Sequence, residues 1–237
     1  MNIFIMGDST CKQNNFLTYP QFGWGQLLHL FVKEDVLVFD YAENGRSTKS
    51  FIDEGRFERI LNEMKPGDFV ICQFGHNDEK IQDPTRYTAP FASYQDNLDY
   101  FAKNVEAKGG HIVFATSITR HKFVDGVCIN THGDYPKAML EYAKKTNHTC
   151  VDMNQATIDL YNEIGEEESS KFHMIFGAGK YSLYPEGKDD HSHLVFNGAL
   201  TIAKLFVDLI SKTDDPINNV LLDLSKAPNV DWKMLID

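Results

Sequence analysis

Five short apolar runs alternate along the chain with segments of helical periodicity. The runs cover residues 2–6, 36–41, 68–74, 111–116 and 149–153. Apolar runs of this length are typical of strands buried on both faces of a parallel sheet. The helical segments between them cover residues 24–32, 51–64, 94–108 and 135–146. This alternation predicts a three-layer α/β/α fold around a five-stranded parallel sheet, with right-handed crossovers and the flavodoxin-like strand order 2-1-3-4-5.

The C-terminal third follows this pattern less closely. Residues 154–165 are compatible with a helix, whereas 166–170 form a polar and charged break that we assign to the solvated surface. Residues 172–189 are rich in glycine and aromatic side chains, and we expect a loop there. An amphipathic helix is predicted over 197–211, because its apolar residues recur at helical spacing. The remaining segment, 212–237, carries little structural signal.

Length and composition fit one globular domain over residues 1–237, in which 213–237 is a tail of unclear role. The formal net charge of -11 argues against a nucleic-acid partner, since phosphate binding relies on excess Lys and Arg. No stretch approaches the ~20 apolar residues that cross a bilayer, so no membrane partner is expected. The oligomeric state is left open. The four cysteines, which lack metal-type spacing, are expected to be free thiols: Cys11, Cys72, Cys128 and Cys150.

The position of the first strand bears on localisation. It begins too early to leave room for a signal peptide, which favours a cytoplasmic protein. A secreted protein whose signal has been removed would give the same pattern, so this second possibility stays open.

Small polar residues follow each of the first three strands. They are Gly7-Asp8-Ser9-Thr10, Asn44-Gly45-Arg46-Ser47 and Gly75-His76-Asn77-Asp78. Each tetrapeptide alone is an ordinary turn. In a 2-1-3-4-5 sheet, however, these three strands are neighbours, and ligands bind at the carboxyl ends of the strands. We therefore expect the three loops to converge on one site.

A late acid-imidazole pair supplies the groups that a serine nucleophile needs. A hydroxyl is a weak nucleophile at neutral pH unless a base takes its proton and an acceptor orients that base. Ser9, His193 and Asp190 can fill these three roles, which predicts a metal-independent, cofactor-free acyl transfer. The backbone N–H groups of Ser9 and Gly45 and the amide of Asn77 can stabilise the oxyanion.

These blocks resemble those of the SGNH (GDSL-like) hydrolases: Gly-Asp-Ser near the N-terminus, a Gly after the second strand, Gly-x-Asn-Asp after the third and a late Asp-x-x-His. Within that superfamily the chain is most similar to the rhamnogalacturonan acetylesterases, from Met1 to about Ser211. The similar stretches are GDST at 7–10, GWG at 23–25, GRSTKSF at 45–51, QFGHND at 73–78 and GDYP at 133–136.

The resemblance implies an esterase that removes acetyl groups from pectic oligosaccharides through an acetyl-serine intermediate. Other SGNH activities remain open, namely a general carbohydrate acetylesterase, a lysophospholipase or a thioesterase, because the catalytic set does not select the acyl group. A non-catalytic carbohydrate-binding module on the same fold is a more distant alternative.

Two alternatives concern the acid-imidazole pair itself. Many members of the family have Asn-Thr where this chain has His191-Ser192, and Asp189 with His191 offers a competing pair. The same stretch could also ligate a metal, since His and carboxylate side chains suit zinc or manganese. The Asp-x-x-His spacing favours Asp190 with His193 and no metal.

A pectic substrate is anionic, so a protein of net charge -11 needs local basic groups to bind it. Candidate basic residues near the expected site are Arg46, Lys49, Arg86, Arg120 and Lys122. We assign substrate binding to Arg46 and Arg120, together with His76 beside the oxyanion amide. Trp24 could stack on a sugar but is better explained as a core residue, and Asp8 as an anchor of the first loop.

Overall fold

The expected parallel sheet is present in the computed structural model, which describes residues 1–226. Its strand order is β2-β1-β3-β4-β7, which is the predicted 2-1-3-4-5 order when the five strands are counted along the chain. All four pairings are parallel. The strands are β1 (Ile3–Gly7), β2 (Val38–Asp40), β3 (Phe69–Gln73), β4 (His111–Ala115) and β7 (Cys150–Val151).

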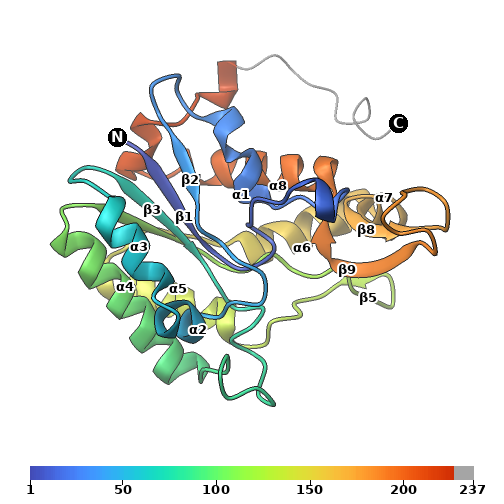
Figure 1. Ribbon diagram of the computed structural model, residues 1–237, viewed down its shortest axis with the longest axis horizontal. Helices are drawn as coiled ribbons and strands as arrows, with labels where there is room; N and C mark the ends of the chain where they lie inside the picture. Colours follow the sequence, from blue (N-terminus) through green and yellow to red (C-terminus); the bar gives the residue numbers. More distant parts are fainter. Residues whose placement is uncertain (227–237) are drawn as a thin grey trace.

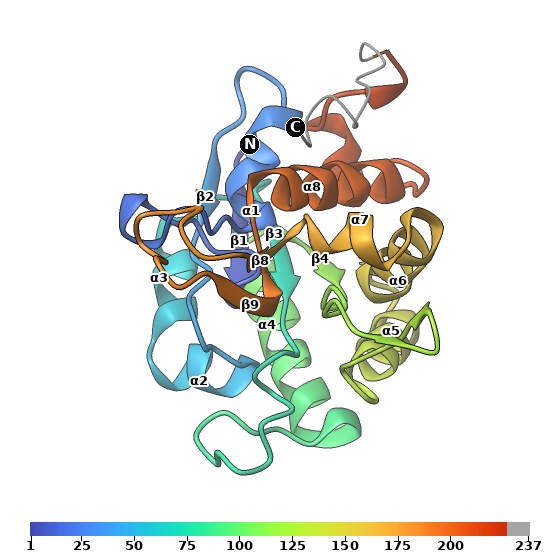
Figure 2. The same ribbon diagram turned by 90° about the vertical axis from the view of Figure 1, so that its right-hand side faces the viewer.

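Alternating side chains of the central strands supply two separate cores. Ile3 and Ile5 face one side of the sheet, whereas Phe4 and Met6 face the other. The first side is covered by α1 (Trp24–Leu27), α6 (Met153–Ile164) and α8 (Phe196–Ile210). The second is covered by α2 (Thr48–Asp53), α3 (Arg56–Glu63), α4 (Gln95–Ala107) and α5 (Tyr135–Thr146). The three-layer prediction is therefore confirmed (Figures 1 and 2).

Two predicted helices are divided in the structure. The segment 51–64 forms α2 and α3, because Gly55 adopts a left-handed conformation between them, with φ of +66°. Ser47 caps α2 through a reciprocal pair of bonds with Ser50, so this helix begins earlier than expected. The segment 24–32 continues from α1 into the 3-10 helix η2 (Leu28–Phe31). Further short turns are η1 (Phe16–Thr18) and the π-helical η3 (Pro90–Tyr94).

The prediction of a loop over 172–189 is wrong at both ends of this range, where strands form. β8 (His173–Phe176) pairs antiparallel with β9 (Lys188–Leu194), and the two strands lie beyond the carboxyl ends of the central sheet (Figure 1). The break predicted at 166–170 is wrong, since this segment forms the helix α7 (Glu166–Ser170), but its three glutamates are solvent-exposed as predicted. Three glutamates occupy the first turn of α7, where negative charge is favourable to a helix.

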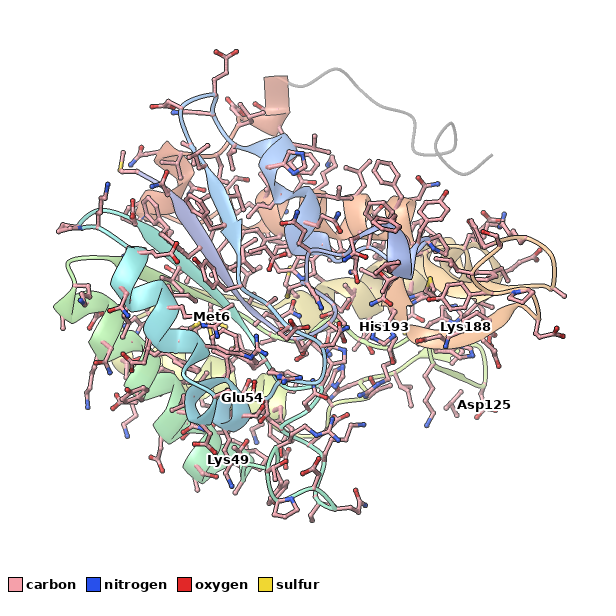
Figure 3. The ribbon with its side chains drawn as sticks, viewed as in Figure 1. Met6, Lys49, Glu54, Asp125, Lys188 and His193 are labelled. Carbon is pink, nitrogen blue, oxygen red and sulfur yellow. The ribbon has the colours of Figure 1, made fainter. Side chains whose placement is uncertain are left out.

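A small hairpin was not predicted. β5 (Phe123–Val124) pairs with β6 (Val127–Cys128) through Asp125 and Gly126, which both have positive φ. An Asp-Gly pair between short apolar stretches is the sequence signal for such a turn. Figure 3 shows Asp125 at the outer tip of the hairpin.

The described part of the tail packs on the body of the protein. It contains η4 (Pro216–Asn219) and η5 (Leu224–Lys226). Ile217 and Leu221 are buried, and the carboxylate of Asp215 lies 2.9 Å from Nε2 of His111 at the start of β4. Residues 227–237 of the predicted tail, and with them part of the predicted single domain, lie outside the described residues.

Two further expectations concern cysteines and membranes. All four cysteines are free thiols, as predicted. Among residues 1–226, no helix has the length and apolar character needed to span a bilayer.

Candidate active site

Ser9 stands in a tight loop directly after β1, and the buried Asp8 fixes that loop. Oδ1 of Asp8 accepts hydrogen bonds from the backbone N–H and the hydroxyl of Thr10, at 2.9 and 2.8 Å. Its Oδ2 lies 3.1 Å from Nδ1 of His76. Burial acts to raise the pKa of Asp8, but the charge and hydrogen bond of His76, with the bonds from Thr10, lower it to about 2. Asp8 is therefore an ionised anchor, as expected from the sequence.

A chain of buried hydrogen bonds ties the same loop to the core. The amide nitrogen of Gln73 donates to the hydroxyl of Thr10, and the indole of Trp24 donates to the amide oxygen of Gln73, both at 2.8 Å. Trp24 has no exposed surface and packs on Phe206 of α8. Trp24 is thus a core residue that positions the loop and has no face available to a sugar.

Ser9, His193 and Asp190 form one continuous line of hydrogen bonds. Nδ1 of His193 lies 2.8 Å from Oδ2 of Asp190, and its Nε2 lies 2.9 Å from Oγ of Ser9. The carboxylate can only accept, so Nδ1 carries the proton and Nε2 accepts from the serine hydroxyl. Residues 184 positions apart therefore meet with the geometry of a nucleophile, a base and its orienting acid.

An irregularity in β9 creates the acid-imidazole half of this line. Asp190 is paired with Met174, and Leu194 with the preceding His173, so residues 191–193 have no partners on β8. The chain folds back on itself there, and Oδ1 of Asp190 accepts the backbone N–H groups of the second and third residues after it, at 3.0 and 3.1 Å. This local turn brings the imidazole at position 193 over the carboxylate.

The environment of Asp190 keeps it ionised. Burial acts to raise its pKa, but the hydrogen bond and charge of His193 outweigh this effect, helped by the N–H groups of Ser192 and His193. The pKa of Asp190 therefore lies well below its ordinary range. A permanent carboxylate is what holds the neighbouring imidazole in one tautomer and stabilises its protonated form.

Each of the three predicted oxyanion donors has an N–H group that, among the described residues, is free to bind a ligand. Within residues 1–226, neither the backbone N–H of Ser9 nor that of Gly45 donates to an internal acceptor. Gly45 has φ of +73°, a conformation that glycine adopts without strain. Asn77 uses one amide hydrogen on the carbonyl of Arg46 at 3.1 Å, which leaves its second hydrogen available. Arg86 donates to the amide oxygen of Asn77 at 3.2 Å and so fixes which side of the amide carries the donors.

The loop that carries Asn77 is held from behind by Asp78. This buried carboxylate accepts the hydroxyl of Thr48 at 2.5 Å and that of Thr88 at 2.9 Å, which links three segments of the chain. Burial raises the pKa of Asp78 to about 7, against the effect of these bonds. Gly75, two residues before Asn77, has φ of +152°, and a Cβ atom there would lie 2.4 Å from the hydroxyl of Ser117, so this position favours glycine.

A cavity of about 480 Å³ lies beside Gly45. Its lining residues are all glycine, polar or charged: Gly45, Arg46, Ser50, Asp53, Glu54, Thr85 and Arg86. Arg46 pairs with Glu54 at 2.9 Å and donates to the carbonyl of Asn44. Arg86 pairs with Asp83 at 2.6 Å. The cavity therefore offers guanidinium groups next to a predicted oxyanion donor.

The other predicted substrate contacts are used inside the protein. His76 is 5% exposed and bonded to Asp8. Arg120 donates to Glu79 at 2.5 Å and to the carbonyl of Thr131 at 3.2 Å, and Glu79 also contacts the buried His132. Of the three residues predicted to bind substrate, Arg46 is therefore the one that lines the cavity. Two further basic candidates lie outside the cavity lining. Lys49 donates to the carbonyl of Pro84, and Lys122 is exposed.

The competing acid-imidazole pair does not reach the serine. Nε2 of His191 lies 3.0 Å from Asp189, and both side chains are exposed. The Nδ1–H of His191 donates to the carbonyl of His121 at 2.8 Å, while the N–H of His121 donates back to the carbonyl of His191. His191 thus holds the folded-back segment of β9 in place. No group of three or more His, Cys, Asp or Glu side chains in the described part of the chain is arranged to hold a metal ion.

A buried histidine behind the triad predicts a pH effect on stability. His173 is 1% exposed, with Nε2 3.0 Å from the hydroxyl of Tyr161. Burial, followed by the nearby His121 and His191, lowers its pKa to about 3. The unfolded chain, with an ordinary histidine pKa near 6.5, then binds the extra proton. The contribution of His173 to stability is therefore complete above about pH 6.5 and is lost as the pH falls towards 3.

We expect the variant His173→Phe to flatten this dependence. Between pH 6 and 4, the free energy of unfolding of the wild type should fall with decreasing pH more steeply than that of the variant. The difference between the two slopes should be about 1.4 kcal/mol per pH unit. Urea unfolding at a series of pH values measures the two slopes. Parallel curves would contradict the buried, neutral state of His173.

Comparison with known proteins agrees with this geometry. Residues 3–194 match the family described as GDSL-like lipase/acylhydrolase, and the chain belongs to this family of SGNH ester hydrolases. It is therefore a carboxylic ester hydrolase.

Two similar proteins come from Bacillus subtilis (strain 168). The chain is 36% identical over 223 residues, 94% of each chain, to the rhamnogalacturonan acetylesterase RhgT. It is 32% identical over 221 residues to YesY, named a probable rhamnogalacturonan acetylesterase, covering 93% of this chain and 97% of the relative. The crystal structure of Bacillus subtilis YxiM has the same fold, with a TM-score of 0.76 and 24% identity over 89% of this chain and 56% of that one.

Proposed function

We propose that this esterase removes acetyl groups from acetylated pectic oligosaccharides of the rhamnogalacturonan type, through an acetyl-Ser9 intermediate. The observation that carries the chemistry is the hydrogen-bonded line from Asp190 through His193 to Ser9. The backbone N–H groups of Ser9 and Gly45, which have no acceptor within residues 1–226, support the predicted oxyanion hole. The substrate class is supported by RhgT and YesY, whose names state that activity, and by the polar cavity beside Gly45.

In the first half-reaction, Oγ of Ser9 attacks the carbonyl carbon of the acetyl ester, while Nε2 of His193 takes the hydroxyl proton. The carbonyl oxygen becomes an oxyanion that accepts hydrogen bonds from the N–H groups of Ser9 and Gly45 and the amide of Asn77. The bond between the acetyl carbon and the sugar oxygen then breaks. His193 gives its proton to that oxygen. The deacetylated sugar then leaves the site, and Ser9 remains acetylated.

In the second half-reaction, water replaces the sugar. His193 removes a proton from the water as the water oxygen attacks the acetyl carbon, and the same N–H groups donate to the second oxyanion. The bond to Oγ of Ser9 breaks, the serine recovers its proton from His193, and acetate is released. Asp190 stays ionised throughout and stabilises the imidazolium in both halves.

The cavity lining offers groups that can hydrogen-bond a sugar. Arginines, carboxylates, hydroxyls and a glycine line it. Arg46 and Arg86 also provide planar donors that match a uronate carboxylate. These features support an acetylated uronate-containing sugar as the occupant.

Acetate release from acetylated rhamnogalacturonan fragments and from acetylated xylan is the test of this assignment. We expect the fragments to have the higher kcat/KM, and p-nitrophenyl esters of long acyl chains to be poor substrates. In Arg46→Ala, the KM for the uronate-containing substrate should rise while that for acetylated xylan stays unchanged. Faster release from xylan would favour a general carbohydrate acetylesterase.

The oxyanion donor Asn77 gives a separate prediction. In Asn77→Ala, kcat for p-nitrophenyl acetate should fall by about 10²- to 10³-fold with little change in KM, because the amide donates mainly to the oxyanion. Arg86→Met, which frees the amide oxygen of Asn77 but keeps its donors, should cause a smaller loss. Wild-type kcat in Asn77→Ala would remove this residue from the oxyanion hole.

A further inference from the structure

Four aromatic side chains form a connected surface near the outer end of the β8–β9 hairpin. Tyr19 contacts Tyr181 edge-on, with ring centroids 5.6 Å apart. Phe176 contacts Tyr181 at 4.6 Å and Tyr184 at 5.9 Å. We refer to Tyr19, Phe176, Tyr181 and Tyr184 as the aromatic platform.

The loop that carries the platform is internally bonded. The N–H of Tyr184 donates to the carbonyl of Tyr181 at 3.0 Å, and the N–H of Gly187 donates to the carbonyl of Tyr184 at 2.9 Å. Gly179 donates to the carbonyl of Pro185, also at 2.9 Å. These bonds restrain the backbone of the loop that carries Tyr181 and Tyr184, which lowers the entropy cost of binding a ligand there.

Two lysines accompany these rings at the surface. Nζ of Lys180 lies 5.7 Å from the ring centroid of Tyr181, and Nζ of Lys188 lies at the same distance from that of Tyr184. Neither ammonium group forms an ion pair with a carboxylate among residues 1–226. Tyr19 is 52% exposed, and Tyr181 and Tyr184 are partly exposed. The ammonium groups of Lys180 and Lys188 thus lie beside exposed ring surface, in a chain whose net charge is -11.

Two segments of the chain connect the platform to the candidate active site. Lys188 begins the strand β9 that carries Asp190 and His193. The segment that carries Tyr19 follows the Ser9 loop, and its Phe22 pairs with Leu194 at the end of β9. In Figure 3, His193 lies between Lys188 on one side and Glu54, which lines the polar cavity, on the other. A sugar chain that places its acetyl group at Ser9 can therefore extend towards the platform.

We propose that the aromatic platform, with Lys180 and Lys188, is a second subsite that binds a non-acetylated, uronate-bearing part of the oligosaccharide substrate. The inference rests on the proposed function for its substrate class. The apolar C–H faces of a sugar ring pack on exposed tyrosine rings, and a uronate carboxylate pairs with an adjacent ammonium group. A neutral sugar would use the rings alone, so the lysines make the subsite selective for an acidic chain.

The test is calorimetric binding of a non-acetylated rhamnogalacturonan oligosaccharide, with a neutral xylo-oligosaccharide as the comparison ligand. The variants are Lys180→Met/Lys188→Met, Tyr181→Ala, and the control Lys137→Met, which removes a lysine held 5.7 Å from the ring of Phe91 elsewhere on the protein. All variants should hydrolyse p-nitrophenyl acetate with the wild-type kcat, because none of these residues touches the triad. Their thermal unfolding serves as the check on folding.

For the acidic ligand, we expect the double lysine variant to raise the Kd by about five- to thirtyfold. Added salt should weaken wild-type binding and reduce this difference. Tyr181→Ala should raise the Kd by about five- to tenfold for both ligands, and Lys137→Met should bind as the wild type does. With the acetylated substrate, the lysine variant should show a higher KM and an unchanged kcat.

The outcomes separate this subsite from the proposed function. Lysine-dependent binding without acetate release by the wild type would support the subsite and contradict the proposed substrate. Acetate release with the same Kd and KM in the lysine and tyrosine variants would support the function and overturn the subsite. Absence of wild-type binding to the non-acetylated oligosaccharide would also overturn it.

Discussion

Replacing Ser9 with Ala is expected to lower kcat by about 10⁴- to 10⁶-fold while leaving the fold intact. The loss is large because the variant has no atom to form the acyl bond, whatever the position of the base. The fold should survive because, within residues 1–226, the Ser9 hydroxyl bonds only to Nε2 of His193. Hydrolysis of p-nitrophenyl acetate and release of acetate from the oligosaccharide measure the effect, with thermal unfolding as the check on structure.

Ser192→Ala is the matched control for this experiment. Ser192 lies next to His193, but its side chain forms no hydrogen bond with the triad, so kcat should stay within about twofold of the wild type, as expected for a partly exposed position. If Ser9→Ala kept activity comparable to that of this control, another nucleophile would have to be sought.

Replacing His193 with Ala should cost about as much as losing the serine, again about 10⁴- to 10⁶-fold in kcat, because nucleophile and base act as a unit. The double variant Ser9→Ala/His193→Ala should then be no slower than either single variant. Steady-state kinetics with p-nitrophenyl acetate at several pH values measures the loss.

His191→Ala separates the two possible acid-imidazole pairs. His191 is two residues away from the base, faces Asp189 and supports β9 through the carbonyl of His121. Removing it should lower kcat by at most about tenfold, the equivalent of one supporting hydrogen bond. A larger loss in His191→Ala than in His193→Ala would assign the base to the other pair.

The sheet could be predicted because its signal is local and redundant. Each central strand is an apolar run, and Ile3, Phe4, Ile5 and Met6 show why: both faces of the strand are buried, so every position is apolar. The helices were predicted from their apolar spacing, but the break at Gly55 depends on one residue with positive φ that periodicity alone does not reveal. Secondary structure was therefore more predictable than its boundaries.

The β8–β9 pair could not be predicted in this way. β9 has the sequence KDDHSHL, which shows no alternation of apolar and polar residues. Its pairing with β8 depends on contacts across the sequence, including Phe22 with Leu194 and His191 with His121. Tertiary contacts of this kind override weak local propensity.

The candidate site was largely predictable because its chemistry is specific to residue type. A hydroxyl, an imidazole and a carboxylate in distant loops were expected to meet, and the structure brings Ser9, His193 and Asp190 into hydrogen-bonding distance. The roles of Arg86 and Arg120 were not predictable. Both are candidates for binding the anionic substrate, and Arg120 is assigned that role. In the structure Arg86 donates to the amide oxygen of Asn77 and Arg120 to the carboxylate of Glu79, and only the folded arrangement reveals these partners.

Mass spectrometry of the enzyme quenched in acid during turnover tests the acyl-transfer account most directly. Our account predicts a transient species heavier by one acetyl group, with the label on the peptide that contains Ser9 and absent in Ser9→Ala. Turnover with no acylated species at saturating substrate, or an acetyl group on a different residue, would contradict it.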